Sequence, residues 1–366
     1  MINNIKKLIV KYNSKEVGYL VEIDNGIAFE YSDAWIKDGF SISPISLPLV
    51  KKVFISNKDY LENLFGVFYD SLPDGWGNLI MKRKFAQEGI NYDKLSPLTK
   101  LSLLSDNGLG GLNYEPVQDV DNENRNEDLD LLAKEAEKIF NSENNDIDLD
   151  SFYRLGGSSG GSRPKVHIKE NEEEWIVKFP CSYDPKNISI EEFEANKLAA
   201  SCSINVNEYK LFPSKLTKGY FGVKRFDRKN NRRIHMISLS SLLETTHRIP
   251  NLDYLHLFQV ISKICIDKSD LYEAYKRMCF NVFYGNKDDH GKNFAFLYDE
   301  DKKGYVLSPF YDITKTKYKI EHEMTVNGNG NPTEEDLLLI GKEFKLSIEK
   351  CKQIIQQIKT VVYKTI

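Results

Sequence analysis

The hydrophobic pattern of this chain shifts at about residue 227 from largely alternating to largely helical, and that shift restricts the fold more than any other feature. Up to about residue 227, apolar residues come largely in short alternating runs such as KKLIVKYN, EVGYLVEID and WIVKFP, a pattern typical of half-buried strands. Beyond it, NLDYLHLFQVISKICI and LYEAYKRMCFNVF carry apolar residues at helical spacing. A β-rich part followed by a helical part predicts an α+β, bilobal protein.

Pattern and composition divide the chain into four segments. Residues 1–116 predict a β-plus-helix subdomain whose helices flank the breaker Pro73-Asp74-Gly75. Residues 117–150 are strongly acidic, with one short helix around Leu131 to Phe140, and predict an inter-domain connection that is mobile at its ends. Residues 151–227 contain a Gly/Ser loop and strands, and residues 228–366 predict a helical lobe. Lobes arranged in this way usually bind ligands in the cleft between them.

Composition excludes several classes of protein. The 366 residues are 41% hydrophobic and 28% charged, as in a globular protein, and the formal net charge of −4 argues against a chain that coats nucleic acid. Five cysteines without a CxxC pair predict reduced thiols rather than a zinc site or a disulfide framework. Because eighteen apolar residues never run together, we expect a cytoplasmic protein without a membrane anchor.

The segment YGNKDDHGKNFAFLYDEDKKGYVLSPFYDI collects oxygen-bearing side chains. Asp288 and Asn293 follow an amphipathic helix, and an apparent hairpin separates them from Asp312. Phosphoryl transfer to a hydroxyl needs a carboxylate that orients the attacking oxygen, and oxygen ligands that hold Mg²⁺ against the phosphates. In chain order, Asp288, Asn293 and Asp312 fit these three roles.

The same residues have a simpler interpretation. Asp288, Asp289 and Asn293 would also suit a solvated turn, and for Asp289 this is the interpretation we favour. His290 is a lone histidine within the loop, so we expect it to have only a supporting role. The six histidines show no HExxH spacing and the chain has no serine hydrolase elbow, which argues against both classes of hydrolase.

A second element is the run LGGSSGGSRPK, where small residues let backbone N–H groups approach phosphate oxygens. On its own such a run is more typical of a linker, but a hairpin follows it directly. The return strand carries Lys178 among apolar residues, where an ammonium group needs an anionic partner such as an ATP phosphate. Glu192 in the next helix is either the acid that positions Lys178 or an exposed acid at a helix start.

Several blocks occur in the order found in HipA-family kinases: GGSSGGSRPK, WIVKFP, YFGVKRFDR, RRIHMISL, FNVFYGNKDDHGKNFAFL, LSPFYDIT and HEMTVNGNGNPT. WIKDGFSISPISLPL with FGVFYDSLPDGWG resembles the family's N-terminal subdomain. The chain therefore resembles a HipA toxin over most of its length. This resemblance implies a bilobal fold similar to that of protein kinases, an ATP- and Mg²⁺-dependent serine/threonine kinase activity, and phosphorylation of a protein.

The resemblance also assigns residues to roles. Asp288 matches the catalytic aspartate, Asn293 and Asp312 match the magnesium ligands, and Lys178 matches the lysine that binds the ATP phosphates. Lys224 and Phe226 would meet adenine through their backbones, and Asp227 would lie near the ribose. The residues expected at ATP are Ser158, Ser159, Gly160, Gly161, Lys178, Lys224, Phe226, Asp227, His290 and Lys292. Ser158, or its neighbour Ser159, matches the autophosphorylated serine, whose phosphate would repel nucleotide and act as an off-switch.

Family partners follow from the same resemblance. They are a small helix-turn-helix antitoxin similar to HipB, operator DNA contacted mainly through that antitoxin, and a protein substrate such as an aminoacyl-tRNA synthetase, whose phosphorylation leads to growth arrest or persistence. Two departures are Lys224, where the best-known member of the family has Glu, and Gly291, at a position often Ser or Ala. Two alternatives stay open: a catalytically weak co-repressor, and a small-molecule phosphotransferase of the aminoglycoside type.

Overall fold

The computed structural model describes residues 2–104, 108–118, 128–141, 149–156, 161–246 and 248–365. The chain forms two compact units. Unit 1 comprises Met1–Ile190, Tyr209–Ile237 and Ser241–Glu244, and unit 2 comprises Glu191–Glu208, Ser238–Ser240 and Thr245–Ile366. The units interleave along the sequence, because α7 (Ile188–Ser201), β12 (Met236–Ser238) and α8 (Leu239–Leu242) each cross a boundary between them.

Unit 1 begins with an antiparallel five-stranded sheet in the order β4-β3-β2-β1-β5. Its strands are β1 (Lys7–Tyr12), β2 (Lys15–Ile23), β3 (Gly26–Tyr31), β4 (Phe54–Ser56) and β5 (Leu112–Glu115). Alternate residues of β1 and β3 are buried, as the period of their apolar residues predicts. The turn between β1 and β2 places Asn13 and Ser14 at φ 45° and 69°, the left-handed conformation that two-residue hairpins require.

The second sheet of unit 1 has the order β6-β7-β9-β8. Its strands are β6 (Lys165–Glu170), β7 (Glu173–Lys178), β8 (Tyr209–Phe212) and β9 (Tyr220–Lys224), followed by the small hairpin of β10 (Arg228–Lys229) and β11 (Arg232–Arg233). The expected hairpin before Lys178 is thus β6–β7, with Lys165 opposite Lys178.

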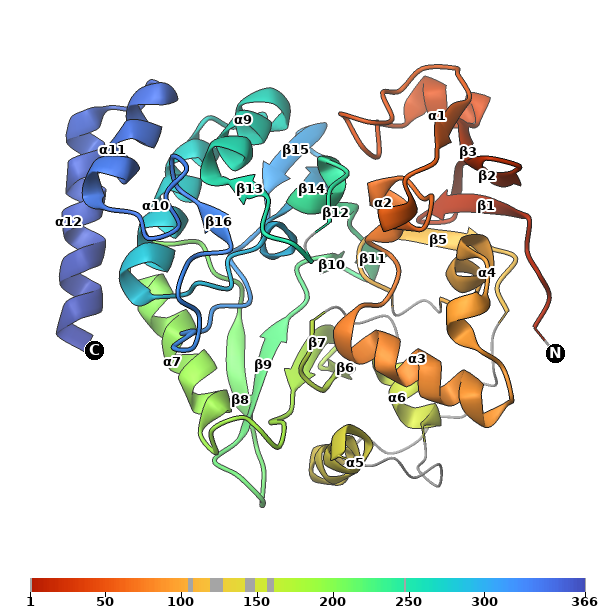
Figure 1. Cartoon of the computed structure of the whole chain (residues 1–366), viewed down its shortest axis with the longest axis horizontal. Helices are drawn as coiled ribbons and strands as arrows, with labels where there is room; N and C mark the ends of the chain where they lie inside the picture. Colours follow the sequence, from red (N-terminus) through yellow and green to blue (C-terminus); the bar gives the residue numbers. More distant parts are fainter. Residues whose placement is uncertain are drawn as a thin grey trace. The chain divides into compact units, whose positions relative to one another are not determined.

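Short helices complete unit 1 (Figure 1). They are α1 (Asp33–Asp38), η1 (Asp59–Leu61), α2 (Gly66–Tyr69), α3 (Gly75–Gln87), η2 (Tyr92–Lys94), α4 (Pro97–Ser102), α5 (Leu129–Asn141) and α6 (Asp150–Gly156). Helices α3, α5 and α6 share one apolar core with β6 and β7. The acidic segment therefore contributes a packed helix to this core, through Leu132, Ala136 and Ile139. The ends of that segment, for which mobility was expected, lie outside the described residues.

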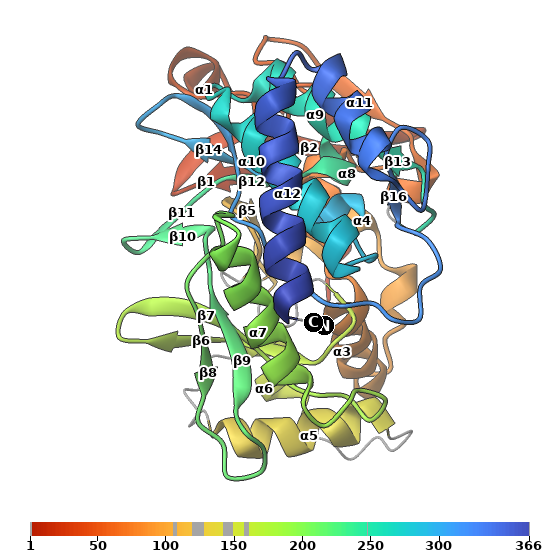
Figure 2. The same ribbon diagram turned by 90° about the vertical axis from the view of Figure 1, so that its left-hand side faces the viewer.

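Unit 2 is mainly helical. It contains α9 (Tyr254–Ile264), α10 (Ser269–Tyr284), α11 (Glu334–Glu343), α12 (Ile348–Thr365), η3 (Gly291–Asn293), the hairpin of β14 (Ala295–Asp299) and β15 (Gly304–Leu307), and the parallel pair β13 (Leu252–Asp253) and β16 (Met324–Thr325). Figures 1 and 2 both show α12 alongside α10 and α11. Helix α9 buries apolar side chains on one face, as its sequence period predicts. Helix α10 is buried more widely, because the consecutive residues 277–281 are all buried, Arg277 and Asn281 among them. Among the described helices, none is both long and apolar enough to cross a lipid bilayer.

Candidate active site

The loop that carries Asp288 begins where α10 ends. Gly285 closes the helix in the left-handed conformation, at φ 80°, and its N–H donates to the carbonyl of Asn281 at 2.9 Å. The loop then runs to the short helix η3. A Cβ atom on Gly291 would lie 2.5 Å from Ser240 Oγ and 2.6 Å from Leu252 Cδ1. A side chain at this position would therefore require the side chains of Ser240 and Leu252 to move.

Asp288 and Asn293 lie together in this loop. The Asn293 side-chain nitrogen donates to the backbone carbonyl of Asp288 at 2.7 Å. Because the amide nitrogen makes this bond, the amide oxygen of Asn293 is the atom that could bind a cation. The Asp288 carboxylate is 33% exposed, and its Oδ1 accepts a hydrogen bond from the ammonium group of Lys319.

Asp289 is fully buried, so the interpretation of this residue as part of a solvated turn was wrong. Its Oδ2 accepts a hydrogen bond from the Tyr254 hydroxyl at 2.9 Å and lies 2.8 Å from His322 Nδ1. Its Oδ1 accepts backbone N–H bonds from Glu323 at 3.0 Å and Met324 at 3.4 Å. Asp289 therefore attaches the loop to α9 and to the segment that enters β16.

Asp312 follows β15 in a left-handed conformation, at φ 57°. The hydroxyl of its neighbour Tyr311 donates to the carbonyl of Lys292 at 2.5 Å. Lys292 precedes Asn293, so this bond joins the neighbours of the two residues expected to bind magnesium. Four residues after Asp312, Thr316 Oγ1 accepts a hydrogen bond from the N–H of Lys287, which precedes Asp288, at 2.7 Å. Two bonds therefore hold the Asp312 segment against the Asp288 loop.

Two further residues that the sequence singled out, His290 and Glu192, lie in unit 2. His290 is the N-cap of η3, where its Nδ1 accepts from the N–H of Lys292 at 3.3 Å. Glu192 lies in α7 and is 3% exposed, so its interpretation as an exposed acid at a helix start was wrong. Burial, and then the charges of Glu191 and Glu192, raises the pKa of Tyr284 to about 12. Lys178 belongs to unit 1, and its pairing with Glu192 stays a prediction.

In unit 1, the described end of the Gly/Ser loop is attached to the start of α3. The N–H of Gly161 donates to Asp74 Oδ1, and the carbonyl of Gly161 accepts from the N–H of Trp76 at 2.8 Å. Lys178 is the last residue of β7, and its Nζ lies 5.8 Å from the centre of the Phe221 ring. Ser158, Ser159 and Gly160 lie outside the described residues.

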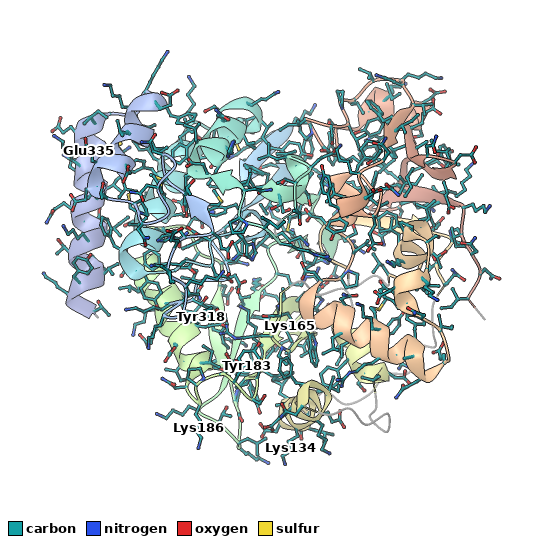
Figure 3. All side chains as sticks on the ribbon, viewed as in Figure 1. Lys134, Lys165, Tyr183, Lys186, Tyr318 and Glu335 are labelled. Atoms are coloured by element: carbon teal, nitrogen blue, oxygen red, sulfur yellow. The ribbon has the colours of Figure 1, made fainter. Side chains whose placement is uncertain are left out.

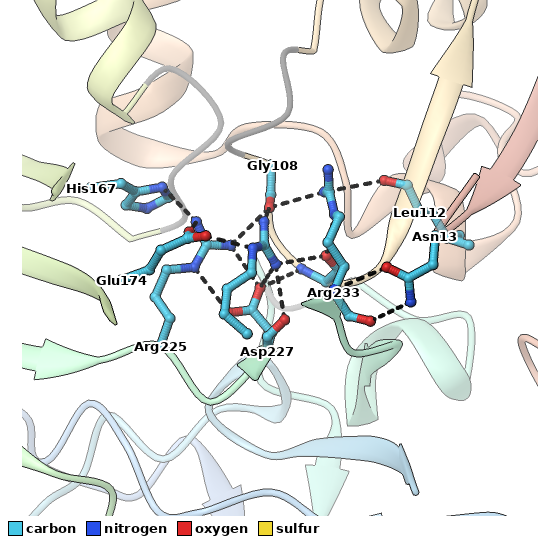
Figure 4. A network of polar contacts seen from close by, with 10 residues as sticks. Asn13, Gly108, Leu112, His167, Glu174, Arg225, Asp227 and Arg233 are labelled. Carbon is cyan, nitrogen blue, oxygen red and sulfur yellow. Dashed lines mark hydrogen bonds and ion pairs between the residues drawn. The ribbon is translucent and has the colours of Figure 1, made fainter. Parts of the chain in front are cut away.

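The segment that carries Lys224, Phe226 and Asp227, which were expected at adenine and ribose, is held by a buried ion pair (Figure 4). Asp227, which is 3% exposed, receives hydrogen bonds from Arg225 at 3.0 and 2.7 Å, from Arg228 at 2.9 Å and from the N–H of Gly110 at 2.7 Å. Burial raises the pKa of Asp227, but the two guanidinium groups outweigh burial and hold it well below its usual range. Lys224, at the end of β9, forms an ion pair with Glu173.

The same network reaches residues that the sequence did not point to. The carbonyl of Gly108 accepts bonds from Arg225 at 2.8 Å, Arg228 at 2.6 Å and Arg233 at 3.2 Å. Arg233 also donates to the carbonyl of Leu112 at 3.3 Å. RFDR and RRIH stood out in the sequence only as family blocks, and nothing in them indicated that they bind a backbone segment more than a hundred residues earlier.

The fold and the oxygen-rich loop together define a protein-kinase-like class of α+β protein. Within this class the chain belongs to the HipA family: the HipA N-terminal domain matches residues 8–115, and the HipA-like C-terminal domain matches residues 157–366. These matches confirm the family resemblance of the sequence blocks.

Two sequence relatives are named as kinases, and a solved HipA structure has a similar fold. Putative kinase Y4dM of Sinorhizobium fredii is 25% identical over 211 residues, which cover 51% of this chain and 51% of the relative, so the match spans about half of that protein. Putative kinase Y4mE of the same organism is 23% identical over 351 residues, which cover 85% of this chain and 78% of the relative. A structure of HipA with HipB and operator DNA from Shewanella oneidensis MR-1 matches with a TM-score of 0.75 and 17% identity, over 98% of this chain and 89% of that chain. This likeness confirms the bilobal, kinase-like fold.

Proposed function

We propose that the chain is an ATP- and Mg²⁺-dependent serine/threonine protein kinase and the toxin of a toxin–antitoxin pair. The observation that carries the proposal is the arrangement around Asp288 in unit 2. Asn293 bonds directly to Asp288, and the bond from Tyr311 to Lys292 brings the neighbour of Asp312 to the neighbour of Asn293. A carboxylate next to two oxygen ligands is what phosphoryl transfer to a hydroxyl requires.

The donor atoms suit magnesium. Mg²⁺ prefers oxygen ligands and is usually held by one or two protein groups together with the phosphates of the substrate. The amide oxygen of Asn293 and the carboxylate of Asp312 would be those protein groups. Bound Mg²⁺ would neutralise charge on the phosphates of ATP. In the described part of the chain, no group of three His, Cys, Asp or Glu side chains is placed to hold a metal ion, so the phosphates of ATP would supply the other oxygen ligands.

Each of the other residues would bind a different part of the reactants. Asp288 would orient the acceptor hydroxyl and take its proton at the carboxylate, while Lys178 would bind a phosphate through its ammonium group. The backbones of Lys224 and Phe226 would hold adenine. Asp227 would lie near the ribose, at a position where its carboxylate is fixed by Arg225 and Arg228.

Other residues complete the proposed ATP site. The Gly/Ser loop, with Ser158, Ser159, Gly160 and Gly161, would cover the phosphates, and His290 and Lys292 would support them. Glu192 would position Lys178. Phosphorylation of Ser158 or Ser159 would switch the enzyme off, because the added charge repels the phosphates of ATP.

The proposed biological setting is the cytoplasm, with translation as the target. A protein substrate such as an aminoacyl-tRNA synthetase would be phosphorylated, leading to growth arrest or persistence, until a small HipB-like helix-turn-helix antitoxin neutralises the chain. Operator DNA would be contacted mainly through that antitoxin. The structure from Shewanella oneidensis, which contains HipA, HipB and operator DNA, supports the antitoxin and the operator DNA as partners.

The test is incubation of the purified chain with Mg-ATP, beside the Asp288→Ala and Ser158→Ala variants, followed by intact mass and peptide mapping. We expect wild type to gain a phosphate in the Gly/Ser loop and Asp288→Ala to gain none. A chain that neither binds ATP nor gains mass, even without a partner and without prior phosphorylation, would contradict the kinase and favour a co-repressor. Phosphate transfer to an aminoglycoside instead of a protein would favour a small-molecule phosphotransferase.

A further inference from the structure

The adjacent carboxylates of Asp288 and Asp289 attach to the same short segment of unit 2. Asp288 accepts from Lys319, and Asp289 accepts the backbone N–H of Glu323 at 3.0 Å. Lys319 in turn donates to Glu323 Oε1 at 2.6 Å. The contacts form a closed ring that runs from Asp288 through Lys319 and Glu323 to Asp289 and back along the chain.

The ring is partly removed from water. The side chains of Lys319 and Glu323 are 22% and 21% exposed, and that of Asp288 is 33% exposed. Burial lowers the pKa of Lys319, but its bonds to Asp288 and Glu323 outweigh burial and raise the pKa, so the ammonium form is favoured. An ion pair shielded in this way holds its geometry better than a fully exposed pair, which contributes little.

Lys319 alone turns inward within its stretch of chain. Tyr318 and Ile320 on either side are 78% and 84% exposed, and Figure 3 labels Tyr318 on this loop. The loop backbone has a separate attachment, because Lys287 Nζ donates to the carbonyl of Ile320 at 2.6 Å. The bond from Lys319 to Asp288 is therefore not needed to hold the loop, and a role in orienting the carboxylate is open to it.

We infer that Lys319 is a positioning residue for the kinase reaction, an inference that rests on the proposed function. By holding Oδ1, Lys319 fixes the rotation of the Asp288 carboxylate and turns Oδ2 toward the acceptor hydroxyl. In the transfer, the acceptor oxygen forms its bond to the γ-phosphorus while the bond from phosphorus to the leaving oxygen of ADP breaks. The hydroxyl proton passes to Asp288 Oδ2, and Lys319 keeps its own proton throughout.

The test compares Lys319→Met, Lys319→Arg, Lys317→Met and Asp288→Ala with wild type. Lys317 is an exposed lysine of the same loop and serves as the matched control. Three quantities are measured: transfer from radiolabelled ATP to casein and to the chain itself, binding of Mg²⁺ with the analogue AMP-PNP by calorimetry, and the midpoint of thermal unfolding.

We expect Lys319→Met to lower kcat about 100-fold, a loss that misplacement of a reacting group by about 1 Å can cause, with nucleotide affinity and unfolding midpoint unchanged. Lys319→Arg should recover most of the rate, and Lys317→Met should match wild type. Transfer by Lys319→Met at the wild-type rate, with Asp288→Ala inactive, would overturn the inference and leave the kinase standing. Equal losses in the Met and Arg variants with a lower unfolding midpoint would show a structural role and also overturn it. If wild type neither binds the analogue nor transfers phosphate, the proposed function fails, and the inference fails with it.

Discussion

The carboxylate of Asp74 accepts a hydrogen bond from the backbone N–H of Gly161, across 87 positions of sequence. Asp74 is also the N-cap residue of α3. The Pro73-Asp74-Gly75 turn before α3 and the end of the Gly/Ser loop are therefore bonded to each other. Gly75 stands at φ 43°, and a Cβ atom there would lie 2.2 Å from the carbonyl oxygen of Gly161. The N-terminal subdomain thus helps to place the loop that the kinase proposal assigns to phosphates.

Removing this carboxylate should weaken nucleotide binding. A hydrogen bond to a charged group contributes about 1.5–3 kcal/mol, and each 1.4 kcal/mol changes an affinity about tenfold. We expect Asp74→Ala to weaken binding of Mg²⁺ with AMP-PNP about tenfold, measured by calorimetry, while the exposed Asp38→Ala serves as control. Wild-type affinity in Asp74→Ala would mean that the loop does not depend on this contact.

The sequence predicted those parts of the fold that follow from local periodicity. The hairpin ending at Lys178 and the helices α9 and α10 were expected, because alternation and helical spacing are properties of neighbouring residues. The burial of Asp289 could not be predicted, since its partner His322 comes 33 residues later. The bond from Arg225 to Gly108 spans 117 residues, and no local pattern encodes it.

The ion pair of Asp227 should make stability depend on pH. Its pKa is held below the usual value in the folded chain, so its contribution is fully present above about pH 4 and is lost as the pH falls through the folded value. Breaking a buried pair costs about 3–5 kcal/mol. We expect Asp227→Asn to lose about that much at pH 7 in urea unfolding.

Measurements at acid pH distinguish a contribution from the charge of Asp227 from one due to packing alone. Because wild type itself loses the contribution of Asp227 in acid, the difference between wild type and Asp227→Asn should become smaller as the pH is lowered below about 4. Urea unfolding at a series of pH values measures that difference. A gap between the two proteins that stays constant from neutral to acid pH would show that the charge of Asp227 does not contribute.

His235 should make stability depend on pH in a higher pH range than Asp227 does. It is fully buried in unit 1, its Nε2 lies 2.8 Å from the carbonyl oxygen of Ile42, and burial lowers its pKa to about 4. The unfolded chain binds a proton near pH 6.5 and the folded chain does not, so stability should fall as the pH drops from about 6.5 to 4.

The size of this effect follows from the shift in pKa. It corresponds to about 3 kcal/mol between the two ends of that range. His235→Gln, whose amide can still donate to Ile42, should be less stable at pH 7 but should lack this slope. Equal slopes in the two proteins, measured by urea unfolding from pH 7 to pH 4, would assign the dependence to other groups.

Asp288 and Asp289 are neighbours in sequence, yet we expect substitution of Asp289 to lower stability and substitution of Asp288 to lower phosphate transfer. Asp289→Ala would leave the buried Tyr254 hydroxyl and the N–H of Glu323 without their acceptor, and removal of a buried charged partner costs about 3–5 kcal/mol. Asp288→Ala removes a partly exposed carboxylate, whose ion pair contributes about 1 kcal/mol at most. Thermal unfolding and phosphate transfer, measured on both variants, should therefore show a marked loss of stability for Asp289→Ala and a loss of transfer at nearly wild-type stability for Asp288→Ala. If the two variants lost stability equally, the division between an anchoring aspartate and a reacting aspartate would be wrong.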